Sequence, residues 1–66
     1  MNFSENFKRE MKYRGISQTT LAEKLNTSQA TISRWMKGVN QPDFESLFLL
    51  CEILDVTPNE LLGWDK

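Results

Sequence analysis

A twenty-residue stretch from Gln18 to Lys37, QTTLAEKLNTSQATISRWMK, constrains the fold of this chain more than any other part. Its apolar residues recur at helical spacing in two short groups, which are Leu21, Ala22 and Leu25, and then Ile32, Trp35 and Met36. Between the groups, Asn26 can adopt a left-handed backbone, and Thr27 or Ser28 can cap a new helix. The stretch therefore predicts two short helices joined by a tight turn at a sharp angle, the layout of a helix-turn-helix.

The rest of the chain also predicts helices, because no segment alternates apolar and polar residues for long enough to indicate a strand. We expect helices over residues 3–14, 18–25 and 29–37, a fourth after Asp43 and a short fifth after Thr57. Polar residues that can cap a helix precede all five, namely Asn2, Ser17, Ser28, Asp43 and Thr57. The expected fold class is all-α: a compact five-helix unit that forms one domain over residues 1–66.

Apolar residues on three of these helices show which of their faces should turn inward. The first carries Phe3, Phe7 and Met11 at intervals of four residues, and the fifth carries Leu61 and Leu62. The inward stripe of the fourth helix should consist of Phe44, Leu47, Cys51 and Leu54, with Leu50 beside it. A chain of 66 residues buries only about 60% of its unfolded surface, so this core is thin.

Size and composition exclude several classes of protein. The chain leaves no room for a ligand pocket or a catalytic domain, and it lacks a membrane-spanning run and a signal-peptide pattern. The single Cys51 excludes an internal disulfide, and the absence of histidine excludes ordinary zinc sites. We therefore expect a cytoplasmic protein with no cofactor, no metal, no membrane contact and no small-molecule ligand within this domain.

The net charge of −1 hides an asymmetry between the two parts of the chain. Residues 1–42 carry seven basic and three acidic side chains, whereas residues 43–66 carry one basic and six acidic side chains. The first part has a net charge of +4 and the second of −5, so one end can face phosphates while the other faces away. The alternative is that both parts are solvated surfaces.

With these features in register, the chain resembles the lambda-repressor-like DNA-binding domains, the phage repressor and Cro type of helix-turn-helix, from Phe3 to Trp64. The family places a small residue at Ala22 and a glycine at Asn26, where asparagine is the next-best residue for a left-handed turn. It also tends to carry a glutamate at Thr20, which would complete a capping box with the preceding helix cap. The resemblance spans nearly the whole chain, including the ending LLGW, which in the family commonly precedes a linker and a second domain. The chain is then either a complete short regulator or the N-terminal domain of a longer repressor.

The second helix of the motif should present its polar face to the major groove. If Ile32 and Trp35 point inward, the outward residues are Ser28, Gln29, Ala30, Ser33, Arg34 and Lys37. We expect base contacts from four of them: Gln29 with adenine, Arg34 with guanine, Ala30 with a thymine methyl, and Ser33. The alternatives are that these residues are solvated surface, or that Arg34 lies across Trp35 or pairs with an acidic side chain.

A second set of residues should hold the phosphate backbone without reading sequence. The resemblance implies this role for Ser17 and Gln18, at the start of the second helix, and for Asn40 and Gln41, after the third. The remaining candidates are Arg14, Ser28 and Lys37, although Ser28 could act only as a cap and Lys37 only on the helix dipole. Lys8, Arg9 and Lys12 suit a solvated face.

The fourth helix is apolar nearly all round, which indicates that something covers it. We expect a homodimer interface, at least on DNA, formed by Phe48, Leu49, Leu62 and Trp64. Phage-repressor-like domains pair in this region, which places two recognition helices about 34 Å apart over a near-palindrome. The alternative is that these side chains cover the domain's own core.

The leading hypothesis is a sequence-specific regulator of transcription, a phage- or prophage-type repressor that binds operator double-stranded DNA as a dimer. The second hypothesis is an antitoxin-like or anti-repressor module that binds a protein through the apolar C-terminal patch. An enzyme finds no support, because the chain has no histidine, no base beside Cys51, no glycine-rich phosphate loop and only dispersed carboxylates.

Overall fold

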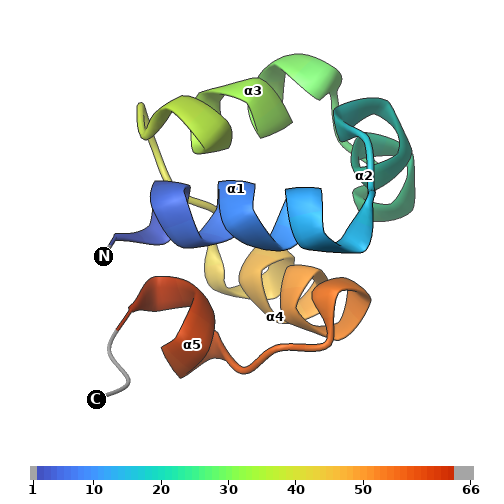
Figure 1. The fold of residues 1–66 in the computed structure, drawn as a ribbon. Helices are drawn as coiled ribbons and strands as arrows, with labels where there is room; N and C mark the ends of the chain where they lie inside the picture. The colour runs from blue at the N-terminus through green and yellow to red at the C-terminus, as the bar shows by residue number, and fades with distance from the viewer. Residues whose placement is uncertain (1, 64–66) are drawn as a thin grey trace.

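The helix order follows the predicted pattern throughout residues 2–63, the part of the chain that the computed structural model describes. The five helices are α1 (Phe3–Arg14), α2 (Gln18–Leu25), α3 (Gln29–Lys37), α4 (Phe44–Leu54) and α5 (Pro58–Leu62). α1 runs through the middle, with α3 on one side of it and α4 and α5 on the other (Figure 1). α2 packs against both α3 and α4 and closes one end of the layers. The predicted all-α class with five helices is confirmed.

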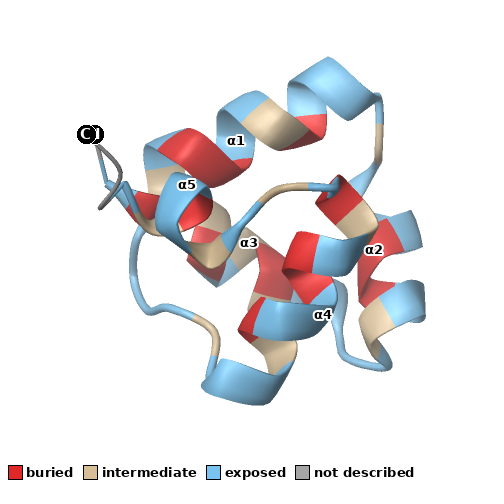
Figure 2. Ribbon diagram, turned by 90° about the horizontal axis from the view of Figure 1, so that it is seen from below, coloured by how far each residue is buried: buried red, intermediate tan, exposed pale blue. Residues whose placement is uncertain are grey.

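The core lies between these layers, where the inward faces of all five helices meet (Figure 2). Phe7 is fully buried and stacks on Phe3, with ring centroids 5.3 Å apart. Its ring also meets the edge of Trp35 at 6.2 Å, which joins α1 to α3. The buried apolar residues are Phe3, Phe7, Met11, Leu21, Ala22, Ile32, Trp35, Leu47, Leu50, Cys51, Leu54 and Leu61.

One predicted core residue lies outside the core. Phe44 was expected on the inward stripe of α4, but its side chain is 79% exposed. Phe44 is the first residue of α4, and the first turn of this helix lies at the edge of the molecule (Figure 2). The buried stripe is instead Leu47, Leu50, Cys51 and Leu54, with Leu50 inside it rather than beside it. Helical spacing places Phe44 on the same face as Cys51, but it does not show whether a neighbouring helix reaches that end of the face.

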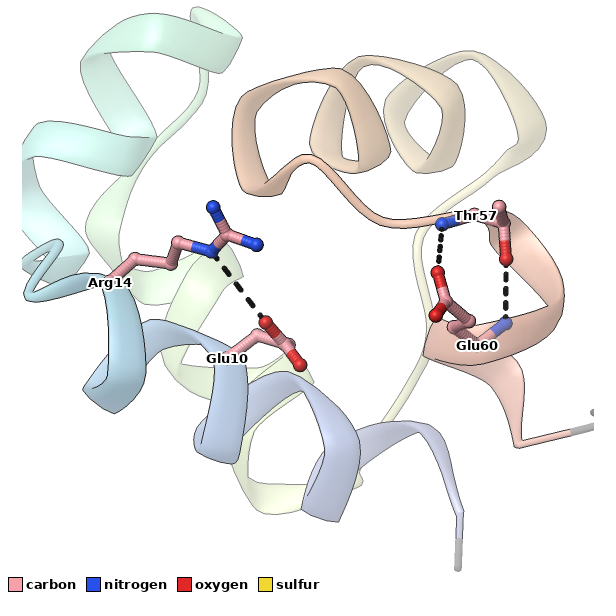
Figure 3. Close-up of polar contacts among 4 residues, drawn as sticks. All are labelled: Glu10, Arg14, Thr57 and Glu60. Atoms are coloured by element: carbon pink, nitrogen blue, oxygen red, sulfur yellow. Dashed lines mark hydrogen bonds and ion pairs between the residues drawn. The ribbon is translucent and has the colours of Figure 1, made fainter.

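Local side-chain caps begin all five helices. The side chains of Asn2, Ser17, Ser28, Asp43 and Thr57 each accept a hydrogen bond from the backbone N–H three residues further on. In α5 the cap is reciprocal: the Thr57 N–H donates to Glu60 Oε1 at 2.8 Å, and the Glu60 N–H donates to Thr57 Oγ1 at 3.1 Å (Figure 3). The start of each helix is therefore determined by residues within its own first turn.

A single polar side chain is buried with the apolar core among the described residues. Asn6 is 2% exposed, and its Nδ2 donates to the backbone oxygen of Leu61 at 3.1 Å. The last carbonyls of a helix have no intrahelical partner, so Asn6 supplies one for the C-terminal turn of α5. The contact joins residues 55 positions apart in the sequence and ties α5 to α1.

Asp43 caps α4 as an anion. Its Oδ1 accepts the Ser46 N–H at 3.0 Å. Hydrogen bonds from the Ser46 side chain and then from the Ser46 N–H lower the pKa of Asp43 below its ordinary value of 3.8. A negative charge also suits the positive end of the helix dipole. The ionised carboxylate is therefore the form that stabilises the start of α4.

No helix formed by residues 2–63 is long and apolar enough to cross a membrane.

We predict that Asn6→Ala destabilises the fold by about 1–3 kcal/mol, because it leaves the buried Leu61 carbonyl without its partner. Urea unfolding followed by far-ultraviolet circular dichroism measures the change. Asn59→Ala is the matched control, because Asn59 is exposed on α5 and should change stability by less than about 0.5 kcal/mol. Equal effects of the two substitutions would contradict the assigned role of Asn6.

We predict that the stability difference between the native chain and Asp43→Asn depends on pH. A group with a lowered folded-state pKa stabilises the fold above its unfolded-state value, and this contribution is lost as the pH falls through the lowered pKa. Asparagine caps equally well but carries no charge. Unfolding measured from about pH 6 down to about pH 2 should show the native chain losing stability relative to Asp43→Asn below about pH 4. Parallel curves for the two proteins would overturn this account.

Candidate nucleic-acid interface

The turn between α2 and α3 is built by the residues that predicted it. Asn26 adopts the left-handed conformation, with φ 57° and ψ 47°, and ends α2. The Thr27 N–H donates back to the Ala22 carbonyl at 2.9 Å, and Ser28 caps α3. The buried Ala22 lets the two helices pack closely. The predicted helix-turn-helix geometry is therefore confirmed.

α3 is anchored on one side and open on the other. Ile32 and Trp35 are buried, and Trp35 meets α1 through Phe7. No other helix of residues 2–63 lies over the opposite side of α3, which forms one surface of the molecule (Figure 1). Exposed residues on α3 and its cap are Ser28, Gln29, Ala30, Arg34 and Lys37, while Ser33 is half-buried. The sequence-predicted base-contact residues thus lie on a single helix, with Ser33 less accessible than the others.

Arg34 takes neither of the two alternative positions considered from the sequence. Its Nη2 donates to Thr31 Oγ1 at 3.3 Å, and within residues 2–63 it neither stacks on Trp35 nor forms an ion pair with a carboxylate. Thr31 Oγ1 in turn lies 3.0 Å from Ser28 Oγ. Sequence reasoning did not single out Thr31. The sequence feature that could have predicted these contacts is the spacing of Thr31, three residues from both Ser28 and Arg34. Side chains at this spacing are neighbours on a helix.

The charge of this surface is positive. The segment of α3, QATISRWMK, contains Arg34 and Lys37 but no acidic residue. A short helix with two cations on its last turns and no anion suits the approach of phosphate.

Arg14 is less available than the cations of α3. Its Nε lies 3.7 Å from Glu10 Oε1, one turn earlier on α1 (Figure 3). Its guanidinium carbon lies 5.5 Å from the centre of the Tyr13 ring. Both side chains remain partly exposed to solvent, which weakens such a pair, so a phosphate can compete with Glu10 for Arg14.

The other predicted phosphate contacts lie at the ends of α2 and α3. Ser17 accepts the Thr20 N–H at 3.1 Å and donates its own hydroxyl to Thr20 Oγ1 at 2.9 Å, so the cap of α2 is satisfied locally. Gln18 is half-buried at the first position of α2, while Asn40 and Gln41 are exposed in the loop after α3.

A second candidate surface lies on α4. Phe48 is 57% exposed and Leu49 is 42% exposed. Phe44, at the start of the same helix, is a third exposed apolar side chain. We call these three side chains the α4 apolar surface. Leu62 is half-buried against the core, and Trp64, which was predicted to join this interface, lies outside the described residues. Tyr13 and Val39 are also exposed apolar residues, and the sequence analysis assigns neither of them to an interface.

Chemically reactive groups are not assembled anywhere in the described part of the chain. Cys51 is buried, and burial together with the Glu60 carboxylate raises the pKa of its thiol, which keeps it protonated at neutral pH. Residues 2–63 contain no group of three or more histidine, cysteine, aspartate or glutamate side chains that could hold a metal ion.

Comparison with known proteins gives a consistent result. A family model described as helix-turn-helix matches residues 7–61. The HTH-type transcriptional activator BcrR of Enterococcus faecalis is 33% identical over 66 residues, which are 100% of this chain and 32% of that protein. The uncharacterized HTH-type transcriptional regulator YqaE of Bacillus subtilis (strain 168) is 33% identical over 60 residues, which are 91% of this chain and 52% of that protein. The chain thus spans about a third and about half of the length of these two relatives.

Solved structures of regulators also match the fold. A transcriptional regulator from Listeria innocua superposes with a TM-score of 0.91 at 32% identity, over 98% of this chain and 61% of the other. The P22 c2 repressor, in complex with a synthetic operator, superposes with a TM-score of 0.90 at 28% identity, over 98% of both chains. These relatives are transcriptional regulators rather than enzymes. The matched helix-turn-helix, the five-helix fold and these relatives show that the chain belongs to the lambda-repressor-like, Cro and C1 type family of helix-turn-helix DNA-binding domains.

Proposed function

We propose that this chain binds a specific, near-palindromic operator as a dimer and represses transcription in the cytoplasm, as a phage- or prophage-type repressor does. The observation that carries the proposal is the outward face of α3, which is polar and cationic, lacks an acidic residue and is left uncovered by the other helices of residues 2–63. The superposition with the P22 c2 repressor over 98% of both chains supports a repressor. Binding of this kind requires no chemistry, because an occupied promoter excludes polymerase.

Sequence would be read by side chains near the N-terminal end of α3, which reach deepest into a major groove, and by Arg34 from its last turn. Gln29 can form two hydrogen bonds with the edge of an adenine, and Arg34 can form two with the edge of a guanine. Ala30 lies between them in the sequence and is small enough to contact a thymine methyl. Ser33 is half-buried, so it would contribute less to base contacts than the exposed residues.

Position on the duplex would be set by phosphate contacts. Lys37, at the C-terminal end of α3, has the reach and the charge for such a contact. The other candidates are Arg14, Ser17, Gln18, Ser28, Asn40 and Gln41. Each phosphate neutralised by a cation should contribute about −0.9 to the slope of log affinity against log salt concentration.

Dimerisation would use the α4 apolar surface, which lies in the acidic part of the chain. Three large apolar side chains exposed on one helix mark an association surface more strongly than scattered single ones. We propose that Leu62 and Trp64 also contribute to this dimer interface. In a symmetric pair, this contact would place two α3 helices about one turn of DNA apart.

The α4 apolar surface also supports a second candidate function, an antitoxin-like or anti-repressor module that binds another protein. The two functions differ in which surface is needed. Arg34→Ala would leave the activity of such a module intact, whereas Leu49→Glu would abolish it.

Selection of binders from random DNA duplexes tests the proposal and the roles on α3. We predict that the native chain enriches a near-palindrome with half-sites about one helical turn apart. Arg34→Ala should weaken binding by about 1–3 kcal/mol and relax the preference at one base pair in each half-site. Lys37→Ala should instead weaken all sequences alike and reduce the salt slope by about one phosphate contact.

Two results would contradict this proposal. Retention of DNA without an enriched sequence would remove sequence-specific binding and favour the protein-interaction module. Identical effects of Arg34→Ala and Lys37→Ala on both the preference and the salt slope would show that the division into base and phosphate contacts is wrong.

We predict that Phe48→Glu disrupts the dimer. Glutamate places a charge at the centre of the α4 apolar surface, so binding to the full operator should fall at least about tenfold while binding to a half-site stays the same. Sedimentation equilibrium and gel-shift titration measure the two effects. Tyr13→Glu is the matched control for sedimentation only, because Tyr13 is also an exposed aromatic residue but lies on α1, beside the candidate phosphate contact Arg14. A dimer that survives Phe48→Glu, or one that Tyr13→Glu disrupts equally, would rule out this interface.

A further inference from the structure

We infer that Thr31 determines the base preference of Arg34: its hydroxyl holds the Arg34 guanidinium along α3, directed toward the N-terminal end of the helix. The inference rests on the proposed function, because it assumes that Arg34 reads a base. Arg34 is the residue that would touch DNA, and Thr31 is a positioning residue that acts through it.

The positioning depends on a row of three side chains along the open face of α3. Ser28, Thr31 and Arg34 are three residues apart, the spacing that places helical side chains next to one another. Arg34 Nη2 donates to Thr31 Oγ1 at 3.3 Å, and Thr31 Oγ1 lies 3.0 Å from Ser28 Oγ. The Thr31 N–H also donates to Ser28 Oγ at 3.2 Å. Thr31 therefore links the helix cap to the arginine.

Thr31 is suited to act as the fixed member of this row. It is half-buried, whereas Ser28 and Arg34 are exposed. Its β-branched side chain has few accessible rotamers, and Ser28 holds it from the side opposite Arg34. The bond to Thr31 uses one N–H of a guanidinium that has five, so the others remain able to donate to a base.

The hydroxyl groups of the row leave one hydrogen for a partner outside the helix. If Thr31 donates its hydroxyl hydrogen to Ser28, then Ser28 Oγ accepts two hydrogen bonds and its own hydrogen is free for a phosphate. If Ser28 donates instead, then Thr31 Oγ1 accepts two hydrogen bonds and the free hydrogen belongs to Thr31. In the first arrangement Ser28 caps α3 and still has a hydrogen to donate to a phosphate, so the two proposed roles do not exclude each other.

The consequence for recognition is preorganisation. A free arginine loses much rotamer freedom when a base fixes its side chain, whereas a tethered one has already lost part of it. The tether should therefore favour sequences that carry the matching base. It should leave binding to unrelated duplexes unchanged, because that binding depends on phosphate contacts.

The test compares Thr31→Val, which keeps the branched shape but removes the hydroxyl, with Thr31→Ser, which keeps the hydroxyl. The first measurement needs no DNA: ¹⁵N relaxation of Arg34 Nε in the free protein. We expect a lower order parameter in Thr31→Val and a native value in Thr31→Ser. Thermal unfolding of both variants checks that the fold is retained.

The second measurement is affinity for the selected operator and for an unrelated duplex. Thr31→Val should weaken operator binding about three- to tenfold, the range for one hydrogen bond, and should leave the unrelated duplex and the salt slope unchanged. In an Arg34→Ala background, Thr31→Val should have no further effect. Thr31→Ser should restore native affinity.

The outcomes separate this inference from the proposed function. An unchanged order parameter of Arg34 in Thr31→Val overturns the tether whether or not DNA binds. An equal loss of affinity from Thr31→Val with and without Arg34 also overturns it, because Thr31 would then act through a contact of its own. Failure of the native chain to prefer any sequence would instead overturn the proposed function, and with it the role in base reading.

Discussion

The contact between Trp35 and the aromatic side chains of α1 decides which face of α3 is turned outward. Trp35 meets Phe7 edge to face, and Phe7 stacks on Phe3, so three rings join the centre of the fold to the candidate recognition helix. Ile32, which is fully buried one turn earlier, fixes the same orientation. Because a helix is rigid, burying these two positions turns Ala30 and Lys37 to the opposite side, with Arg34 exposed beside them. The polar face of α3 is thus a consequence of the aromatic core.

Local signals in the sequence were sufficient to predict the helices and their boundaries. Asn2, Asp43 and Thr57 each cap a helix within three residues of themselves, so their effect could be seen without knowledge of the fold. Asn26 is a similar case, because a left-handed residue between two helical segments leaves little choice of turn. The candidate face of α3 follows from the same local periodicity, given that Trp35 is buried.

Features that depend on a distant partner could not be predicted in this way. Phe44 lies seven residues before the buried Cys51 and so on the same helical face, yet its side chain is 79% exposed. Asn6 lies between Phe3 and Phe7 on the inward side of α1, and only its bond to Leu61 explains a buried amide there. Thr31 is a different case, because its partners Ser28 and Arg34 are close to it in sequence. Its hydroxyl could bond to several nearby groups, so only the side-chain positions show which partners it has.

The arrangement of α3 separates residues that hold the fold from residues that face solvent. Ile32 and Trp35 contribute to the core, whereas Gln29, Ala30 and Arg34 are exposed and contribute little to it. Substitutions at exposed positions usually change stability by less than about 0.5 kcal/mol. A chain of this design can therefore exchange the side chains on its outward face while the scaffold stays the same. Such a domain can acquire a new target by mutation without passing through an unfolded intermediate in its evolution.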